Sequence, residues 1–424
     1  MSRPGNLPTA KGRPGRRGRQ AALAALAGLA VMIAGCGQSQ QPPGRGAEVL
    51  TGHVERLSPG GISARQVAAA EDAFGLALLG KACPAMPTSN LLLSPDSAAE
   101  ALGMLYSGAQ GPAATAMGRL LRLPAWSPAL VAALHEHAAA LARVRQLEVS
   151  NHLFEQAGSR PAQRVLDDLR TAYDADLQLV DFGDEPATTT TINAVVSRDT
   201  HGLIPDLFGQ PLATSTRLVL TNALYLKARW QQPFPAASPA RFRTAAGKVV
   251  TVSLMRGVPG AAGYHRAGGW QSATLPYTGR DLAAVAILPP AGPAGCAVPT
   301  TAQWAKLTTT DATTAAGVSL PKLRLSQTWD QLQATLAAMG LPLGGNYAGL
   351  GGGGQISQIV QKATMDVGET GTTAAAATGV AVGTAEPAGP QVTLTFNRPF
   401  LLVLEDTATR TPLFLARIAN PTQS

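Results

Sequence analysis

Few residues of this chain have the types and spacing that enzymes use for catalysis or for metal binding. His135 and His137 lie two residues apart in a segment with a helical pattern, so their side chains would lie on different faces of that helix. No Gly-x-Ser-x-Gly sequence is present, which counts against a hydrolase of that type. The glycines at 351–354 are not followed by the Gly-Lys-Ser/Thr of a phosphate-binding loop. These patterns predict a protein that is not an enzyme and binds no metal or cofactor.

A segment near the C-terminus has the composition of a strand that could be added to a sheet. It follows a strand-like run at 359–367 and precedes the apolar sequence at 396–400. Side chains of an extended strand alternate between two faces. One face would carry small or β-branched residues, namely Thr372, Ala374, Ala376, Thr378, Val380, Val382 and Thr384. The other face would be almost bare, with Thr373, Ala375, Ala377, Gly379, Ala381, Gly383 and Ala385.

The segment also has features of a helix and of a surface loop. Four consecutive alanines usually favour a helix, but glycine, threonine and valine flank them here. Ala, Gly and Thr also fill flexible surface loops of low complexity. The small, alternating side chains favour a segment that can slide between two existing strands.

The positive charge of the chain is concentrated at its N-terminus. The net charge is +8, and residues 1–35 contain six lysines and arginines and no acidic residue, which leaves 8 − 6 = +2 for the rest. A net charge of +2 is too small for binding to nucleic-acid phosphates, and we therefore expect no nucleic-acid partner. Apolar residues make up 45% of the chain, which predicts a sizeable core.

The basic N-terminus leads into an apolar stretch at 21–34 and then to Cys36, a pattern typical of an export signal. The stretch is short for a transmembrane helix. Small residues directly before a cysteine resemble a bacterial lipobox, which would make Cys36 the lipid-bearing first residue of the mature protein. The alternatives are an ordinary signal peptide cut elsewhere and a small cysteine of the core. We therefore expect an export signal of lipoprotein type at 1–35 and an extracytoplasmic protein, secreted or lipid-anchored to the outer face of the cell membrane.

Two regions follow the signal. Residues 36–64 are rich in Gln, Pro, Gly and Ser, which predicts a flexible tether, and 65–424 shows no repeat and no second composition, which predicts a single domain. The domain contains Cys83 and Cys296, which in an exported protein could form a disulfide or could both stay free.

Helical patterns dominate the first part of the domain and strand patterns the second. The helical segments lie at 68–83, 95–107, 129–145 and 162–173. Apolar strand-like segments follow at 218–226, 273–276, 283–288, 316–323, 392–396 and 400–405. Helices mostly first and strands mostly later indicate an α+β fold.

Short motifs occur in a fixed order over most of the domain, at 91–95, 102–109, 151–154, 192–193, 200–204, 221–227, 233–234, 275–277, 288–289, 396–400, 412–414 and 420–421. In order and spacing, these motifs and the alternating segment at 369–385 resemble the serpins, a family of serine protease inhibitors. The resemblance implies a large mixed or antiparallel main sheet, smaller sheets, about eight or nine helices and an exposed reactive loop. It also implies a monomer.

The resemblance assigns roles to the residues of the alternating segment. Its hinge would comprise Glu369, Gly371, Thr372, Ala374, Ala375, Ala376, Ala377 and Thr378. A count from the hinge places the reactive bond between Ala385 and Glu386, whereas a count back from Phe396 ends near Ala388. The protease would attack this bond as it attacks a substrate. The acyl-enzyme would then be trapped by insertion of residues 371–384 into the main sheet, a mechanism known for the family.

Further roles follow from the same matching. Ser94, Asn222 and Gln361 would form a cluster that controls opening of the main sheet, and Trp230 would be an aromatic residue beneath the top of that sheet. Many serpins have a histidine where this chain has Gln361. Glutamine can donate and accept hydrogen bonds but cannot titrate, so opening should not respond to histidine protonation.

The loop composition indicates the class of target protease. From 379 to 395 the chain has no lysine, arginine or aromatic residue, so it offers nothing to a trypsin-like or chymotrypsin-like pocket. Small residues favour serine proteases of elastase-like or subtilisin-like specificity, held in a covalent complex. One alternative is a non-inhibitory serpin-like lipoprotein that binds or scaffolds other molecules. Another is a lipid-anchored solute-binding protein or hydrolase unrelated to serpins, which would need a ligand pocket or catalytic constellation that the sequence does not display. Bulky or charged residues from 371 to 378 would favour the non-inhibitory serpin, and none is present there.

Overall fold

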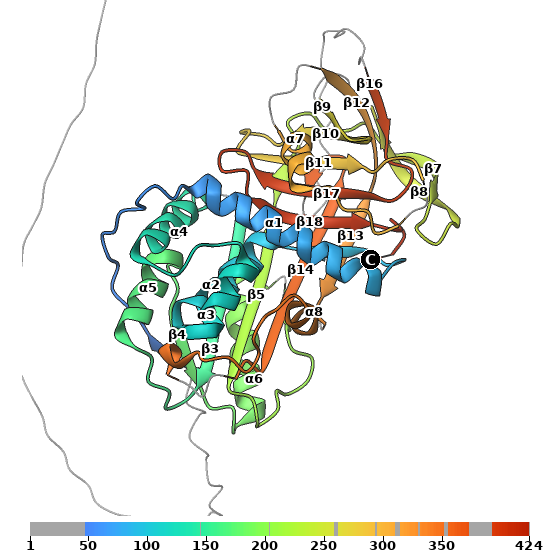
Figure 1. Cartoon of the computed structure of the whole chain (residues 1–424). Helices are drawn as coiled ribbons and strands as arrows, with labels where there is room; N and C mark the ends of the chain where they lie inside the picture. The colour runs from blue at the N-terminus through green and yellow to red at the C-terminus, as the bar shows by residue number, and fades with distance from the viewer. Residues whose placement is uncertain are drawn as a thin grey trace, which may run out of the picture. The chain divides into compact units, whose positions relative to one another are not determined.

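The computed structural model divides the chain into two units, Met1–Gly44 and Arg45–Ser424. The structure describes residues 47–144, 146–202, 204–257, 262–292, 295–309, 314–329, 331–351, 355–372 and 392–423, all within the second unit (Figure 1). The predicted export signal and Cys36 lie outside the described residues, as do Ala374–Ala377, Thr378, Ala385 and Glu386. Within the described part, no helix combines the length and apolar character that a membrane span needs.

The helices lie mainly in the first half of the domain. They are α1 (Ala64–Ala82), α2 (Pro95–Gly108), α3 (Gly111–Leu121), α4 (Pro128–Leu141), α5 (Gln163–Tyr173), α6 (Glu185–Asp199), α7 (Thr301–Leu307) and α8 (Leu332–Ala338), with 3₁₀ turns η1 (Cys83–Ala85) and η2 (Ala348–Leu350). Polar side chains start several of them. The Ser63 hydroxyl caps α1 in a box with Gln66, and the Ser94 hydroxyl accepts from the Ser97 N–H at the start of α2.

One sheet of eight strands, here called the main sheet, carries the predicted hinge. Its path is β1 (Glu48–Leu50), β4 (Leu177–Val180), β3 (Leu147–Gln156), β5 (Leu218–Leu226), β14 (Gln358–Gly368), β15 (Gly371–Thr372) and β6 (Ala228–Arg229), with β13 (Leu323–Thr328) also paired to β14. The pairs β3–β4 and β5–β14 are parallel, whereas β3–β5 and β13–β14 are antiparallel. The sheet is therefore mixed.

The other described strands form a ten-stranded sheet. Its path is β2 (Leu91–Leu93), β18 (Pro412–Ile418), β17 (Phe400–Asp406), β11 (Leu282–Leu288), β10 (Trp270–Pro276), β9 (Ala262–Ala267), β12 (Ala315–Pro321), β8 (Val249–Arg256) and β7 (Ser238–Arg243), and β16 (Val392–Thr395) pairs with β12. Every residue of β11, β17 and β18 is buried, which agrees with their mainly apolar sequences.

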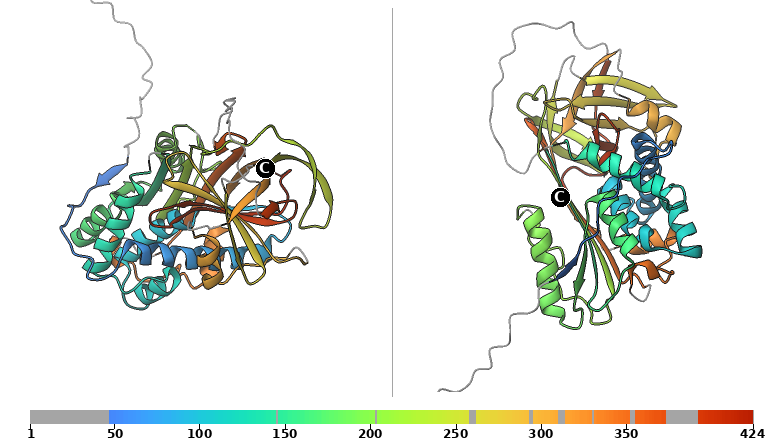
Figure 2. Two further views of the ribbon diagram at one scale, coloured as in Figure 1. Left: turned by 90° about the horizontal axis from the view of Figure 1, so that it is seen from above. Right: turned by 90° about the vertical axis from the view of Figure 1, so that its left-hand side faces the viewer.

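Helices cover both faces of the main sheet (Figure 2). On one face, α6 packs Ile192 and Val196 against Phe154, Val219 and Val360 of the sheet. On the other face, α1–α5 enclose the larger core, which includes Phe74 and Leu102. With eight α-helices among the described residues and mixed and antiparallel sheets, the expected α+β fold is confirmed.

The segment predicted as a tether at 36–64 differs from the expectation in its described part. Glu48–Leu50 forms β1 at the edge of the main sheet, where it pairs with β4. The His53 N–H then donates to Asp167 Oδ1 at 2.7 Å, and the Glu55 N–H donates to Thr171 Oγ1 at 2.9 Å. From residue 47 the chain is therefore attached to the domain by backbone hydrogen bonds, which a Gln-, Pro- and Gly-rich composition does not reveal.

A disulfide joins Cys83 in η1 to Cys296 in the loop before α7. The sequence left this pairing open because it gives no distance between the two residues. The bond connects the end of α1 to a segment 213 residues later in the chain.

Candidate functional site

The predicted hinge begins as a short strand at one end of the main sheet. After β14 ends at Gly368, the chain turns through Glu369 and Thr370 and runs back as β15. Thr372 pairs with Val367 of β14, and on its other side with Ala228 of β6. Two residues of the hinge therefore already lie in the sheet as an antiparallel strand between β14 and β6.

Gly371 occupies a position that other residues would strain. Its φ angle is +152°, and a Cβ atom built there would lie 2.1 Å from the carbonyl oxygen of Ala228. Glycine tolerates both the backbone angle and the close approach. The strand can therefore start beside β6 only because residue 371 lacks a side chain.

Thr372 is the first hinge side chain to be buried, at 1% exposure. Its hydroxyl lies 2.5 Å from the hydroxyl of Tyr277, so the two polar groups satisfy each other. Burial raises the pKa of Tyr277 far above its usual value, and the smaller opposing effect of Thr372 does not offset it. The phenol is therefore neutral.

Trp230, predicted as an aromatic at the top of the sheet, fixes the turn before the hinge. Its indole Nε1 donates to the carbonyl of Gly368 at 2.9 Å, and its backbone N–H donates to the carbonyl of Thr370 at 3.0 Å. Its ring stacks on Tyr277, with ring centres 4.4 Å apart, and meets Phe234 edge-on. The same aromatic group thus holds both the turn and the first buried hinge residue.

Glu369 ties the turn to Lys322, between β12 and β13, and to the segment that follows Phe234. Its carboxylate lies 2.9 Å from Lys322 Nζ, and its Oε1 accepts from the Ala237 N–H at 3.4 Å. Partial burial alone would raise the pKa of Glu369, but hydrogen bonds from Lys322 and backbone groups and the Lys322 charge hold it below its usual range. The sequence did not identify Lys322, which lies 47 residues away along the chain.

The structure brings Ser94, Asn222 and Gln361 together, although their role in sheet opening stays a prediction. Gln361 Nε2 donates to Asn222 Oδ1 at 2.6 Å and to the Ser94 carbonyl at 3.1 Å, while its Oε1 accepts from the Ser94 N–H at 3.1 Å. All three residues are buried. Their hydrogen bonds link β5 and β14 to each other and to the start of α2.

Sequence reasoning missed three further members of this network. The Asn222 side-chain amide donates to Ser97 Oγ and to Asn151 Oδ1. Asn151 Nδ2 in turn donates to Glu100 Oε2 at 2.5 Å. Ser97 and Asn151 lie within or beside motifs at 91–95 and 151–154, but pairing across the sheet is visible only in the fold.

The arrangement of β5 and β14 is suited to accept another strand. These two strands are paired in parallel from Val219 with Gln358 to Leu224 with Ala363. Beyond that register they separate, and β15 lies between β14 and β6, the continuation of β5. A strand that continued β15 would run antiparallel to both neighbours, where it could form ladders on each side.

Comparison with known families and relatives gives a consistent result. A sequence model of the Serpin family, described as serine protease inhibitor, matches residues 69–421. The leukocyte elastase inhibitor of Bos taurus is 30% identical over 384 residues, which cover 84% of this chain and 100% of that protein. An uncharacterized serpin-like protein of Thermococcus kodakarensis is 30% identical over 78% of this chain and 81% of its own length.

Solved structures share the fold. The native state of tengpin, a thermophilic serpin, has a TM-score of 0.76 at 22% identity and covers 89% of this chain and 100% of its own. Thyroxine-binding globulin in complex with thyroxine has a TM-score of 0.68 at 25% identity and covers 84% of this chain and 99% of its own.

Proposed function

The chain belongs to the serpin family, and we propose that it inhibits serine proteases as a suicide substrate rather than acting as an enzyme. The observation that carries this proposal is the position of β15. Gly371 and Thr372 already occupy the first two positions of a strand between β14 and β6, the continuation of β5. Insertion would then be the extension of an existing strand, so it needs no new nucleation.

The register of β15 predicts where the inserted residues would lie. Thr372 pairs with Val367 and with Ala228. Six residues further along the inserted strand is Thr378, six residues before Val367 is Gln361, and six residues before Ala228 is Asn222. Thr378 would therefore lie between the two residues that bridge the closed sheet. Its hydroxyl could replace part of the hydrogen bonding that their separation breaks.

The length of the sheet supports the reactive bond at Ala385–Glu386. In the same register, ten residues beyond Thr372 is Val382 and ten before Ala228 is Leu218, the first residue of β5. The bond after Ala385 would thus lie three residues beyond the end of β5 (385 − 382 = 3), so insertion of 371–384 fills the whole gap. The alternative site near Ala388 would leave about six residues outside the sheet, with no strand to pair them.

The side chains that would enter the sheet are small and uncharged. Ala374, Ala376, Thr378, Val380 and Val382 would face the same side as buried Thr372. A gain of about a dozen ladder hydrogen bonds at about 0.5–1.5 kcal/mol each gives about 6–18 kcal/mol. This is comparable with the stability of a typical domain, about 5–15 kcal/mol, so insertion could distort an attached protease.

The chemical step is an ordinary acyl transfer that stops at the acyl-enzyme ester. The protease serine oxygen would attack the carbonyl carbon of Ala385, the bond to the Glu386 nitrogen would break, and that nitrogen would leave as an amine after gaining a proton. The hinge side of the loop would stay esterified to the protease. Insertion would then carry the protease away from its working geometry before water can hydrolyse the ester.

The target and the location of the protein are also proposals. The loop composition favours an elastase-like or subtilisin-like protease, and the similarity to a protein named leukocyte elastase inhibitor agrees with the first. The basic and apolar N-terminus with small residues before Cys36 supports an extracytoplasmic lipoprotein. A lipid at Cys36 would hold the inhibitor at the outer face of the membrane.

The experiment is to incubate the protein with pancreatic elastase and with subtilisin, followed by denaturing electrophoresis and mass mapping of the released C-terminal fragment. The proposal predicts a complex that survives detergent and a fragment that begins at Glu386. Clean cleavage with full protease activity remaining would instead indicate a non-inhibitory member that binds or scaffolds other molecules.

A further inference from the structure

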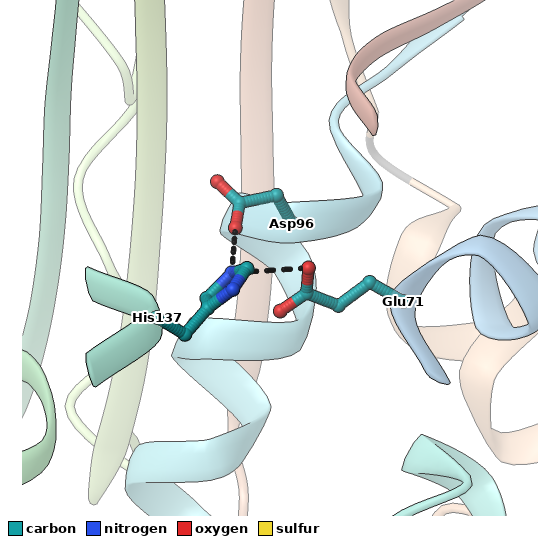
Figure 3. Close-up of side chains that lie close together, drawn as sticks. All are labelled: Glu71, Asp96 and His137. Atoms are coloured by element: carbon teal, nitrogen blue, oxygen red, sulfur yellow. Dashed lines mark hydrogen bonds and ion pairs between the residues drawn. The ribbon is translucent and has the colours of Figure 1, made fainter. Parts of the chain in front are cut away.

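A group of buried ionisable side chains lies between the helices beneath the main sheet, separate from the hinge. Glu71 comes from α1, Asp96 from the first turn of α2 and His137 from α4 (Figure 3). Glu71 is 4%, Asp96 0% and His137 2% exposed. Three helices therefore contribute one potential metal ligand each to a common point inside the protein, and the ligand atoms all lie within 4.8 Å of one another.

Both carboxylates face the same nitrogen of His137. His137 Nε2 lies 3.2 Å from Glu71 Oε2 and 3.4 Å from Asp96 Oδ1. A single N–H cannot donate well to two oxygens, and Glu71 Oε2 has no hydrogen-bond partner among the described residues. In a tetrahedral zinc site with bonds of about 2.0–2.1 Å, neighbouring ligand atoms are separated by about 3.3 Å. The two separations from His137 Nε2 match that spacing, and the two carboxylates offer oxygen atoms within 4.8 Å of each other.

The carboxylates of the cluster have unsatisfied oxygens. Besides Glu71 Oε2, Asp96 Oδ2 has no hydrogen-bond partner among the described residues, although both residues are buried. A buried polar atom without a partner is costly unless a water molecule or an ion satisfies it. A bound cation would satisfy oxygens of both residues at once.

A small cavity lies beside Glu71 and His137, and a larger one leads from Asp96 toward the surface. A cavity of about 10 Å³ is lined by Glu71, Glu100 and His137, which is close to the space that one water molecule occupies. A second cavity of about 740 Å³ is lined by Asp96 and Glu100 and extends to exposed Asp174 and Val54. Asp96 and Glu100 therefore connect the cluster to the protein surface.

We propose that Glu71, Asp96 and His137 form a binding site for one divalent cation of the zinc type. His137 Nε2 and one oxygen from each carboxylate would be three ligands, and Glu100 or a water molecule would complete the tetrahedron. Imidazole with carboxylates suits zinc, whereas magnesium prefers six oxygen ligands in an octahedron. The ion would hold α1, α2 and α4 together next to Ser94, which bonds to Gln361 of β14.

The test measures zinc binding to the full-length chain after removal of metals with a chelator. Cys36→Ser is present in every sample, because that cysteine lies outside the Cys83–Cys296 disulfide and a free thiolate could bind zinc. The proposal predicts one zinc ion per chain and no magnesium binding. X-ray absorption at the zinc edge should show nitrogen and oxygen ligands at about 2.0–2.2 Å and no sulfur. Zinc should raise the melting temperature, because it binds only the folded chain.

Matched variants distinguish this site from other histidines. His137→Gln and Glu71→Gln should each weaken zinc binding by more than about 100-fold, whereas exposed Glu136→Gln on the same helix should leave it unchanged. Melting temperatures in chelator show which variants fold. Glu71→Gln removes one of several crowded carboxylates, so we expect it to fold. It provides the test of the site if His137→Gln does not fold. Failure of the parent chain to bind zinc, or equal binding by all folded variants, would overturn the proposal.

Discussion

Gln361 and Asn222 lie directly opposite each other in the parallel pairing of β5 and β14, and the Gln361 side-chain amide donates to Asn222 Oδ1 at 2.6 Å. This contact bridges the two strands that would have to separate for insertion. The register of β15 would place Thr378 between the same two residues. Insertion would therefore break the hydrogen bond between Gln361 and Asn222 and place the Thr378 hydroxyl at the same position in the sheet.

Gln361→His should make the closed sheet sensitive to pH. Burial disfavours imidazolium, so the folded pKa of the new histidine should lie below the unfolded value of about 6.5. The unfolded state then binds more protons, and stability should fall as pH decreases through about 6.5. The measurement is the free energy of unfolding at pH 8 and pH 5.5, each relative to the parent chain. A constant difference between the two proteins would contradict the prediction.

Gly371→Ala should destabilise the hinge strand by about 1–3 kcal/mol, because the new Cβ would clash with the Ala228 carbonyl at a positive φ. Gly368→Ala is the matched control, since a Cβ there meets no atom within 4 Å. Chemical denaturation measures both. Similar effects of the two substitutions would show that the close approach at Gly371 does not matter.

Thr378→Arg should stop insertion near the middle of the sheet, because it would bury a charge between Asn222 and Gln361. The expected result is cleavage of the loop without a detergent-stable protease complex. Thr373→Arg is the control on the opposite face, where the register places it beside half-exposed Asp366. The Thr373→Arg variant should retain most of the protease inhibition. Loss of inhibition in both variants would contradict the assigned faces.

Tyr277→Phe should cost about 1–3 kcal/mol, because it leaves the buried Thr372 hydroxyl without its partner at 2.5 Å. Thr372→Val removes the other hydroxyl. In the double variant the losses should not add, with a coupling of about 0.5–3 kcal/mol. Additive losses in a double-mutant cycle would show that the two hydroxyls do not stabilise each other.

Glu369→Gln should weaken the turn before the hinge by less than about 1 kcal/mol, since the pair with Lys322 is partly exposed and screened by solvent. The pKa of Glu369 is lowered in the folded state, so its contribution is present above the usual glutamate pKa and disappears as pH falls through the folded value. The difference between parent and variant should therefore vanish in acid. Asp366→Asn, which removes the pair with Arg324, is the control away from the turn.

The α+β fold was predictable because local patterns of helix and strand carry that information. The hinge and the roles of Ser94, Asn222, Gln361 and Trp230 came from the resemblance in motif order, and those roles stay predictions. The contacts that join distant segments were not predictable. Lys322, just before β13, reaches Glu369, and Tyr277, just after β10, reaches Thr372, only because the fold brings segments of both sheets beside the hinge.

The inability of local sequence to reveal contacts between distant segments also explains the two largest differences between the expectations and the structure. Glu48–Leu50 has no apolar run that marks a strand, and it pairs at the sheet edge because β4 offers free backbone groups there. The second difference concerns His137, for which the sequence offers only His135 as a possible partner, two residues away. Its actual partners, Glu71 and Asp96, come from two other helices.

Thermal unfolding of the intact protein and of the protein cleaved in the loop tests the central claim most directly. Insertion of 371–384 between β5 and β14 predicts a melting temperature higher by more than about 10 °C after cleavage, and no such rise for Thr378→Arg. An unchanged melting temperature in the cleaved parent protein would show that the strand does not insert, and the inhibitory mechanism would be wrong.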